Sequence, residues 1–162
     1  LYGSRLNTIF STADALEEYV TTADLVIGSV LIPGGAAPKL VNREMVSRMK
    51  RGSVLVDVAI DQGGCFETSK PTTLADPIFT VDEVVHYCVS NMPGAVARTS
   101  TFALNNATLP FVLALANKGY RRALTDDKHF RDGLNVCRGH LTHAAVARDL
   151  GITYTDALNA LT

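Results

Sequence analysis

The sequence predicts an α/β fold, in which part of a doubly wound parallel sheet is followed by a helical segment. Three observations support this prediction. The strand candidates of the first half are nearly continuous runs of Val, Ile and Leu, which suits strands of a parallel sheet that is covered on both faces. Helical stretches separate these runs. Beyond Pro93 the strand candidates stop and helical candidates replace them.

The first half supplies the alternating elements. Ser11-Thr12 precede ADALEEYV as an N-cap region with acidic residues in the early turns, which predicts a helix over 13–20. A second helix is expected over Asn42–Met49, ending near Gly52. The strand candidates are DLVIGSVLI, SVLVDVAI, IFTV and VVHYCVS, with a loop over Pro71–Pro77 between the second and the third.

The second half is predicted to be helical. Residues 99–118 form a long apolar-rich helix candidate, with Gly119 as its stop and Pro110 as a kink or break. HLTHAAVARDLG is the clearest helix of the more polar tail. We therefore place a domain boundary near residue 95, which divides residues 1–95 from residues 96–162.

The first residues suggest a start within a domain. LYGSRL is typical of the last turn of a helix with Gly3 as its stop, and an extended NTIF follows. We expect the chain to be a piece of a longer polypeptide. If half of the sheet lies upstream, a strand of this piece presents an unpaired edge.

Composition excludes several classes of partner. The chain has 162 residues, 47% of them hydrophobic, and Lys+Arg 15 balance Asp+Glu 16, so a nucleic-acid function is not expected. No apolar run approaches the roughly 18 residues of a membrane span, and the start lacks the zones of a signal peptide. Cys65, Cys88 and Cys137 form no CxxC pair and fit reduced thiols of a soluble, cytoplasmic protein.

Three predicted strand ends carry small or polar residues beside an apolar one. Ligands of open parallel sheets bind beyond the carboxyl ends of the strands, where the loops converge. Any one of these loops alone is more typical of an ordinary turn, and the three together are as consistent with a ligand crevice as with ordinary turns. The loops are Val30–Gly35, Ile60–Gly64 and Ser90–Gly94.

The second loop follows two carboxylates. If the strand continued, Asp57 and Asp61 would project to the same side, with Asp57 about two pleats deeper. Asp57 is then predicted to be a buried acceptor for backbone N–H groups. Asp61 would lie at the mouth of the crevice, where an ionised carboxylate can bind a ligand or offset a positive charge. A turn-capping aspartate is the alternative for Asp61.

The histidines do not indicate a metal site. His86 lies in a strand candidate and His129 in a polar loop, while His140 and His143 are close enough to share a helix face. No third ligand accompanies this pair, so surface histidines are favoured over a metal. The chain also has no GxSxG motif, which argues against a serine hydrolase of the α/β type.

Longer segments carry a family resemblance. ADLVIGSVLIPGGAAPKLV, MVSRMKRGSVLVDVAIDQGGCFETSKPTT and HYCVSNMPGAVARTSTFALNNATLPFVLALANKG together resemble the carboxyl-terminal part of the L-alanine dehydrogenase family. The resemblance implies part of a Rossmann domain and a helical return to a substrate domain after Arg98. It also implies NAD-dependent oxidative deamination of L-alanine to pyruvate and ammonium, and the reverse, in a homohexamer. In the family, the catalytic lysine and histidine and the glycine-rich loop lie upstream of such a segment.

The resemblance also assigns site residues. Asp61 corresponds to the family's active-site aspartate beside the nicotinamide. Lys70 stands where the family often has an arginine near the cofactor, and this departure keeps the charge but loses the fork geometry. The other positions are Ser11, Val30 and Leu31 around the adenosine half, Val58, Ala59 and Ile60 near the nicotinamide, and Val89, Ser90, Asn91 and Met92 in the closing loop.

Two other interpretations compete with this one. The NAD-binding subunit of proton-translocating transhydrogenase shares the Pro-Gly, Asp57 and Gly-Gly features, but usually has a glutamate in place of Asp61 and an asparagine in place of Cys65. A non-catalytic nucleotide-binding module would keep the three loops without needing a carboxylate at the nicotinamide end.

Overall fold

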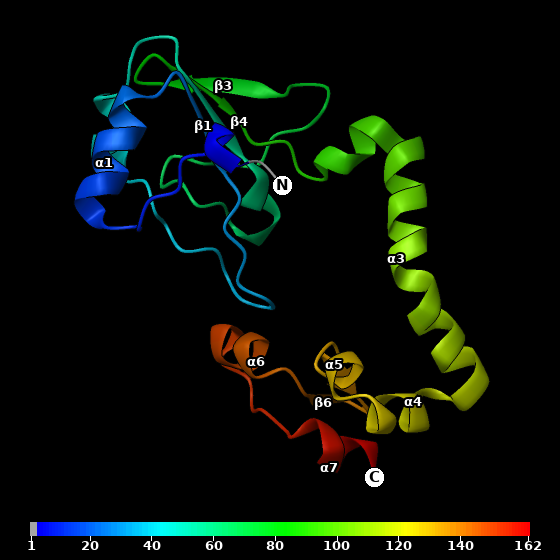
Figure 1. The fold of residues 1–162 in the computed structure, drawn as a ribbon. Coiled ribbons are helices and arrows are strands. Elements are labelled where there is room, and N and C mark those ends of the chain that lie inside the picture. Colours follow the sequence, from blue (N-terminus) through cyan, green and yellow to red (C-terminus); the bar gives the residue numbers. More distant parts are fainter. Residues whose placement is uncertain (1–2) are drawn as a thin grey trace. The chain divides into compact units, whose positions relative to one another are not determined.

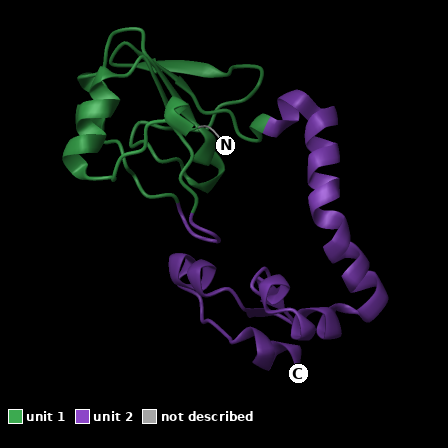
Figure 2. Cartoon of the chain, viewed as in Figure 1, with its two compact units in different colours: residues 1–31, 37–92 green, residues 32–36, 93–162 purple. Residues whose placement is uncertain are grey.

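The computed structural model describes residues 3–162 and divides them into two compact units. The first unit contains the residues up to Leu31 together with Ala37–Met92, and the second contains Ile32–Ala36 together with Pro93–Thr162 (Figure 2). The domain assignment made from the sequence stays a prediction. Leu1 and Tyr2, part of the expected helix end, lie outside the described residues. Gly3–Arg5 form a short 3-10 turn, so the turn continues past Gly3.

A four-stranded sheet organises the first unit, in the order β1-β2-β4-β3. The neighbours β1–β2 and β2–β4 are parallel, which confirms the predicted parallel α/β class (Figure 1). β3 pairs with β4 in the antiparallel sense, a feature that the sequence analysis did not foresee. The bounds are Leu25–Gly28 for β1, Val54–Asp57 for β2, Ile78–Val81 for β3 and Val84–Tyr87 for β4.

The antiparallel pair follows from a tight turn. Val81 pairs with Val84, so only Asp82 and Glu83 connect the two strands. Both residues have positive φ, 50° and 63°, as the two central residues of a mirror-image hairpin turn do. A connection of this length joins antiparallel strands, because a parallel crossover needs many more residues.

Two capped helices lie beside the sheet. α1, Ala13–Thr22, begins where the Thr12 side chain accepts a hydrogen bond from the Ala15 N–H at 3.2 Å. α2, Arg43–Ser47, is capped by Asn42, which accepts from the Met45 N–H at 2.8 Å. Both helices occur where expected, although α2 ends before the predicted Met49.

The core of this unit lies on one face of the sheet. Val46, Leu55 and Phe66 are among its most buried side chains, at 0%, 0% and 1% exposure. On the opposite face Leu25 and Ile27 of β1 are 54% and 60% exposed. The expectation of a sheet covered on both faces is therefore met on one face only within the described residues of this unit.

The second unit is mainly helical. Its longest helix, α3, spans Ala97–Lys118, contains Pro110 and ends at Gly119. The predicted stop is confirmed. Of the kink or break predicted at Pro110, the break does not occur, because the helix continues through this residue. The 3-10 helix η3 (Met92–Val96) begins at the last residue of the first unit. The remaining elements of the second unit are α4 (Tyr120–Asp126), α5 (Lys128–Arg131), β5 (Val136–Cys137), β6 (His140–Leu141), α6 (Ala144–Leu150) and α7 (Ala157–Leu161).

The histidine predictions need correction in this unit. His140 lies in the strand β6, and His143 is the N-cap of α6, so the two do not share a helix face. His129 lies in α5 and not in a loop. Among the described residues no three His, Cys, Asp or Glu side chains gather as a metal site would require. No helix within residues 3–162 is both long and apolar enough to cross a bilayer.

Gly28, the last residue of β1, lets the side chains of Cys65 and Phe66 pack directly against the backbone of this strand. A Cβ atom at this position would lie 2.2 Å from the Cys65 Sγ and 2.7 Å from the Phe66 Cζ. Both neighbours are buried at 1% exposure, so neither can move aside without disturbing the core.

We expect Gly28→Ala to lower the free energy of unfolding by about 1–3 kcal/mol, because the added methyl overpacks the core. Thermal and urea unfolding of the complete protein measure this loss. Gly133→Ala is the matched control, since its Cβ would meet its nearest neighbour, the Phe130 carbonyl oxygen, at an ordinary 3.4 Å. Equal stability of the two variants would contradict the packing argument.

Candidate functional site

A cavity of about 360 Å³ lies where the loops after β1 and β2 meet. Both loops leave the carboxyl ends of parallel strands, the position at which open α/β sheets bind ligands. Among the residues singled out from the sequence, the cavity brings together Val30, Leu31, Val58, Ala59 and Asp61. Ser29 and Gln62 complete the lining and were not singled out.

The chain leaves the sheet earlier than predicted. β2 ends at Asp57, and Val58–Gln62 form the 3-10 helix η2, which ends at Gly63 with φ 91°. The side-chain carboxylate of Asp57 caps η2 by accepting the Ala59 N–H at 3.1 Å. The prediction that Asp57 and Asp61 project from one continuous strand is therefore wrong.

Asp57 is a buried acceptor, as predicted. It is 0% exposed, and its Oδ2 accepts hydrogen bonds from the Cys65 N–H at 2.9 Å and from the Ser69 hydroxyl at 2.5 Å. A weaker bond comes from the Phe66 N–H at 3.4 Å. These bonds fold residues 58–69 around one carboxylate, because each donor comes from a different part of that segment.

The thiol of Cys65 is buried and contacts the Asp57 carboxylate, and burial and this contact both raise the pKa of the thiol. The sulfur lies 3.5 Å from Asp57 Oδ1. Burial, and then the charge of Asp57 and the hydrogen bond to it, raise the pKa of Cys65 to about 12. Burial also raises the pKa of Cys88 and lowers that of His86, whose ring nitrogens contact the Thr68 hydroxyl at 2.7 Å and the Val84 carbonyl at 3.0 Å.

Asp61 differs from Asp57 in its surroundings. It is exposed at the cavity, and its Oδ2 accepts the backbone N–H of Asn91 at 3.3 Å. Asn91 has φ 56°, a left-handed conformation that asparagine adopts more readily than most residues. In the described part of the chain, this bond to a residue 30 positions away is the one that the carboxylate makes, so Asp61 does not cap its own turn.

The remaining predicted site residues do not line this cavity. Ile60 and Val89 are buried, at 3% and 0% exposure. Of the two neighbours of Asn91, Ser90 is exposed and Met92 is half-buried. Ser11 is exposed just before α1. The Lys70 ammonium lies 4.4 Å from the centre of the Phe79 ring, which is a cation–π contact, and the same ring stacks with that of His86.

Lys39 is a structural support that sequence reasoning missed. Its Nζ donates to the carbonyls of Gly63 and Gly64 at 2.5 and 2.8 Å, and so holds the Gly-Gly turn that follows η2. The contact spans 24 residues, and no local pattern in the sequence signals it.

The loop after Leu31 continues into the second unit. There Asp149 accepts the Ala36 N–H at 3.0 Å, and this bond, with the neighbouring Arg148, lowers the pKa of Asp149.

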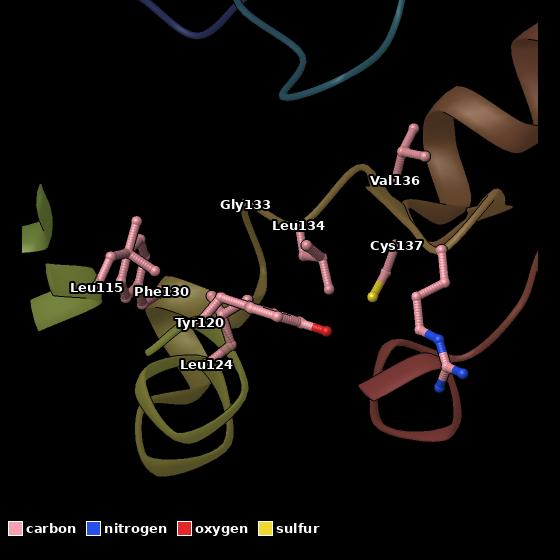
Figure 3. Close-up of a pocket in the computed structure, with 9 residues that line it drawn as sticks. Leu115, Tyr120, Leu124, Phe130, Gly133, Leu134, Val136 and Cys137 are labelled. Carbon is pink, nitrogen blue, oxygen red and sulfur yellow. The ribbon is translucent and has the colours of Figure 1, made fainter. Parts of the chain in front are cut away.

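A larger cavity, of about 420 Å³, lies in the second unit (Figure 3). Its described lining is mainly apolar and includes no carboxylate. The lining residues are Leu115, Tyr120, Leu124, Phe130, Gly133, Leu134, Val136, Cys137 and Arg138.

The fold and the cavity define the class of protein: an α/β domain with a cavity beyond the carboxyl ends of two parallel strands, where domains of this class bind ligands. Residues 1–144 match the family described as "Alanine dehydrogenase/PNT, C-terminal domain", and the chain belongs to this family.

Named relatives agree with this membership. The chain is 67% identical to "Alanine dehydrogenase" of Halomonas elongata and 54% identical to that of Mycolicibacterium smegmatis, each over 160 residues. These matches cover 99% of the chain but 43% of each relative, so the chain spans less than half the length of the curated relatives it matches.

Solved structures show the same relationship. An "L-ALANINE DEHYDROGENASE" matches with a TM-score of 0.76 at 50% identity, over 93% of this chain and 41% of that one. A transhydrogenase from Sinorhizobium meliloti matches with a TM-score of 0.57 at 33% identity, over 64% of this chain and 30% of that one. The transhydrogenase is the less similar of the two on each of these measures.

The two acids near the end of β2 should respond differently to removal. We expect Asp57→Ala to cost about 3–5 kcal/mol of unfolding free energy, because it leaves several buried donors without an acceptor. Asp61→Ala, at an exposed position, should stay within about 0.5 kcal/mol of the wild type. Urea unfolding of both variants measures the difference, and similar losses would contradict the distinct roles.

The raised pKa of Cys65 predicts a thiol that resists alkylation. Because its pKa is raised to about 12, the thiolate stays scarce between pH 7 and 9, where an ordinary thiol becomes rapidly more reactive. Iodoacetamide labelling followed by peptide mass spectrometry measures this rate, with urea-unfolded protein as the control. Native labelling of Cys65 that rises with pH like that of a free thiol would contradict the prediction.

Proposed function

We propose that this chain is part of an enzyme that catalyses NAD-dependent oxidative deamination of L-alanine to pyruvate and ammonium, and the reverse. One observation carries the proposal. An exposed carboxylate, Asp61, stands at a cavity formed by two parallel strand ends and is bonded to the backbone of a third loop. The names of the relatives, alanine dehydrogenases at 54–67% identity, support it.

The residues at the cavity fit part of a dinucleotide. Leu31 and Val58 are 68% and 50% exposed there, and such open apolar walls suit the flat faces of a nucleotide ring. The cavity lining also contains polar groups, the Asp61 carboxylate and the Gln62 side chain. We propose that Val30, Leu31, Val58, Ala59 and Asp61 hold the cofactor together with Asn91. Ser11, Ile60, Lys70, Val89, Ser90 and Met92 remain proposed contacts from the family resemblance.

The reaction gives Asp61 a physical task. NAD, when bound, supplies the ring that takes the hydride from the α-carbon of alanine. As the hydride leaves, positive charge develops on the substrate carbon and nitrogen. A carboxylate held in place before the reaction stabilises that charge without reorganising, and it also orients the water or ammonia that reacts at this carbon.

The rest of the machinery is proposed to lie outside this chain. In the family, a lysine and a histidine handle proton transfer and the substrate carbonyl, and both belong to the upstream part. We propose residues 1–95 as part of the cofactor domain and residues 96–162 as the return to the substrate domain. We further propose a cytoplasmic homohexamer, and the three free, buried cysteines fit a reducing compartment.

Asp61→Asn tests the role of the carboxylate in the complete protein. The amide oxygen can still accept the Asn91 N–H, but the negative charge is lost, so kcat should fall by about 100-fold or more while the Kd for NAD stays within a few-fold. Steady-state kinetics and calorimetry measure the two quantities. Asp76→Asn, at an exposed loop position outside the cavity, is the control and should leave both unchanged. Unchanged turnover of Asp61→Asn would refute the proposed role.

A further inference from the structure

The loop Ile32–Ala36 directly follows Val30 and Leu31, two residues of the cavity lining. By its contacts the loop belongs to the second unit, whereas Leu31 before it and Ala37 after it belong to the first (Figure 2). Leu31 is 68% exposed, so packing alone does not hold it in place. The conformation of the loop therefore contributes to where this part of the cavity wall lies.

A side chain distant in the sequence bonds to the loop backbone. Asp149, near the end of α6, accepts the Ala36 N–H with its Oδ2 at 3.0 Å. This bond is the largest cause of the lowered pKa of Asp149, and the neighbouring Arg148 adds to it. The carboxylate is therefore ionised near neutral pH, and its bond to Ala36 is charge-assisted.

Two glycines let the loop approach the residues of α6 closely. A Cβ atom on Gly34 would lie 2.3 Å from the Cε1 of His143, the N-cap of α6, and one on Gly35 would lie 3.3 Å from Asp149 Oδ2. Gly34 also has φ 71°, a conformation that costs glycine little. The contact with α6 thus involves the loop backbone at consecutive positions.

The end of the loop is tied to the cavity as well. Ala37 donates its N–H to the carbonyl of Gln62 at 2.9 Å, and Gln62 belongs to η2 and to the cavity lining. Two successive N–H groups, those of Ala36 and Ala37, are therefore bound by Asp149 and by η2. Without Asp149, the bond to η2 remains, and the loop between Leu31 and Ala37 gains conformational freedom.

We propose that Asp149 is a positioning residue for cofactor binding. By accepting the Ala36 N–H, it keeps the loop after β1, and with it Val30 and Leu31, in the conformation that binds the dinucleotide. Asp149 itself does not line the cavity. The inference rests on the proposed function, because that function identifies NAD as the ligand.

Asp149→Ala in the complete protein tests the inference. The Kd for NAD should rise by about fivefold, because a smaller fraction of the molecules then has the binding-competent loop. The kcat at saturating NAD and L-alanine should stay within about twofold, since the loop supplies no group to the reacting carbon. This pattern is the reverse of that expected for Asp61→Asn. Calorimetry and steady-state kinetics measure the two quantities.

Three further measurements separate positioning from a general loss of stability. Asp149→Asn keeps an oxygen that can accept the Ala36 N–H, and it should bind NAD within about twofold of the wild type. Arg148→Ala removes the other partner of Asp149 and should also leave the Kd unchanged. Hydrogen exchange of the Ala36 amide should accelerate in Asp149→Ala alone. The Asp149 side chain is 31% exposed and Ala36 is exposed, so the substitution leaves no buried donor unpaired and the variant should fold.

The outcomes distinguish the inference from the proposed function. If the wild type binds NAD and Asp149→Ala binds it equally well, even with a lower Tm, Asp149 is only structural and the inference alone is overturned. An Arg148→Ala variant that weakens binding as much as Asp149→Ala would also overturn it, because the ion pair would then be the cause. A wild type that does not bind NAD would overturn the proposed function and, with it, this inference.

Discussion

The buried carboxylate of Asp57 is the interaction on which the first unit and its candidate site depend. A buried charge is unfavourable unless hydrogen bonds replace the lost water, and here donors from Ala59, Cys65 and Ser69 do so. The donors belong to the segment that carries η2 and the Gly-Gly turn. Satisfying the charge therefore fixes the path of that segment at the end of β2, and with it the crevice.

The second carboxylate of the site, that of Asp61, is exposed but held in place by a hydrogen bond. Asp61 follows Asp57 by one 3-10 turn, and the N–H of Asn91 ties it to the loop after β4. Lys39 holds the following glycines through their carbonyls. Electrostatic stabilisation of a reaction is most effective when the charge is in place beforehand, and these contacts meet that requirement.

Local patterns predicted the elements better than their pairing. The helix at Ala13–Thr22 was expected from the N-cap pattern of Ser11-Thr12, and the Thr12 side chain accepts an N–H group three residues away. The helix at Arg43–Ser47 was also expected, and the structure shows that Asn42 is its cap. The antiparallel direction of β3 depends on Asp82-Glu83, which lacks the Asn-Gly or Gly signal of such turns. The 3-10 helix after Asp57 was missed because Val58–Ile60 continue the apolar strand pattern, while a side-chain bond decides where the strand ends.

By itself, the sequence determined the α/β class, the position of the parallel strands and the residue types at their carboxyl ends, since these follow from periodicity and composition over a few neighbouring residues. It also marked Asp57 as buried and Asp61 as exposed at the rim. Only the tertiary structure decided that Asn91 donates a hydrogen bond to Asp61 and that Lys39 holds the Gly-Gly turn. These contacts join residues up to 30 positions apart, and they exist only once the sheet has brought its loops to one edge.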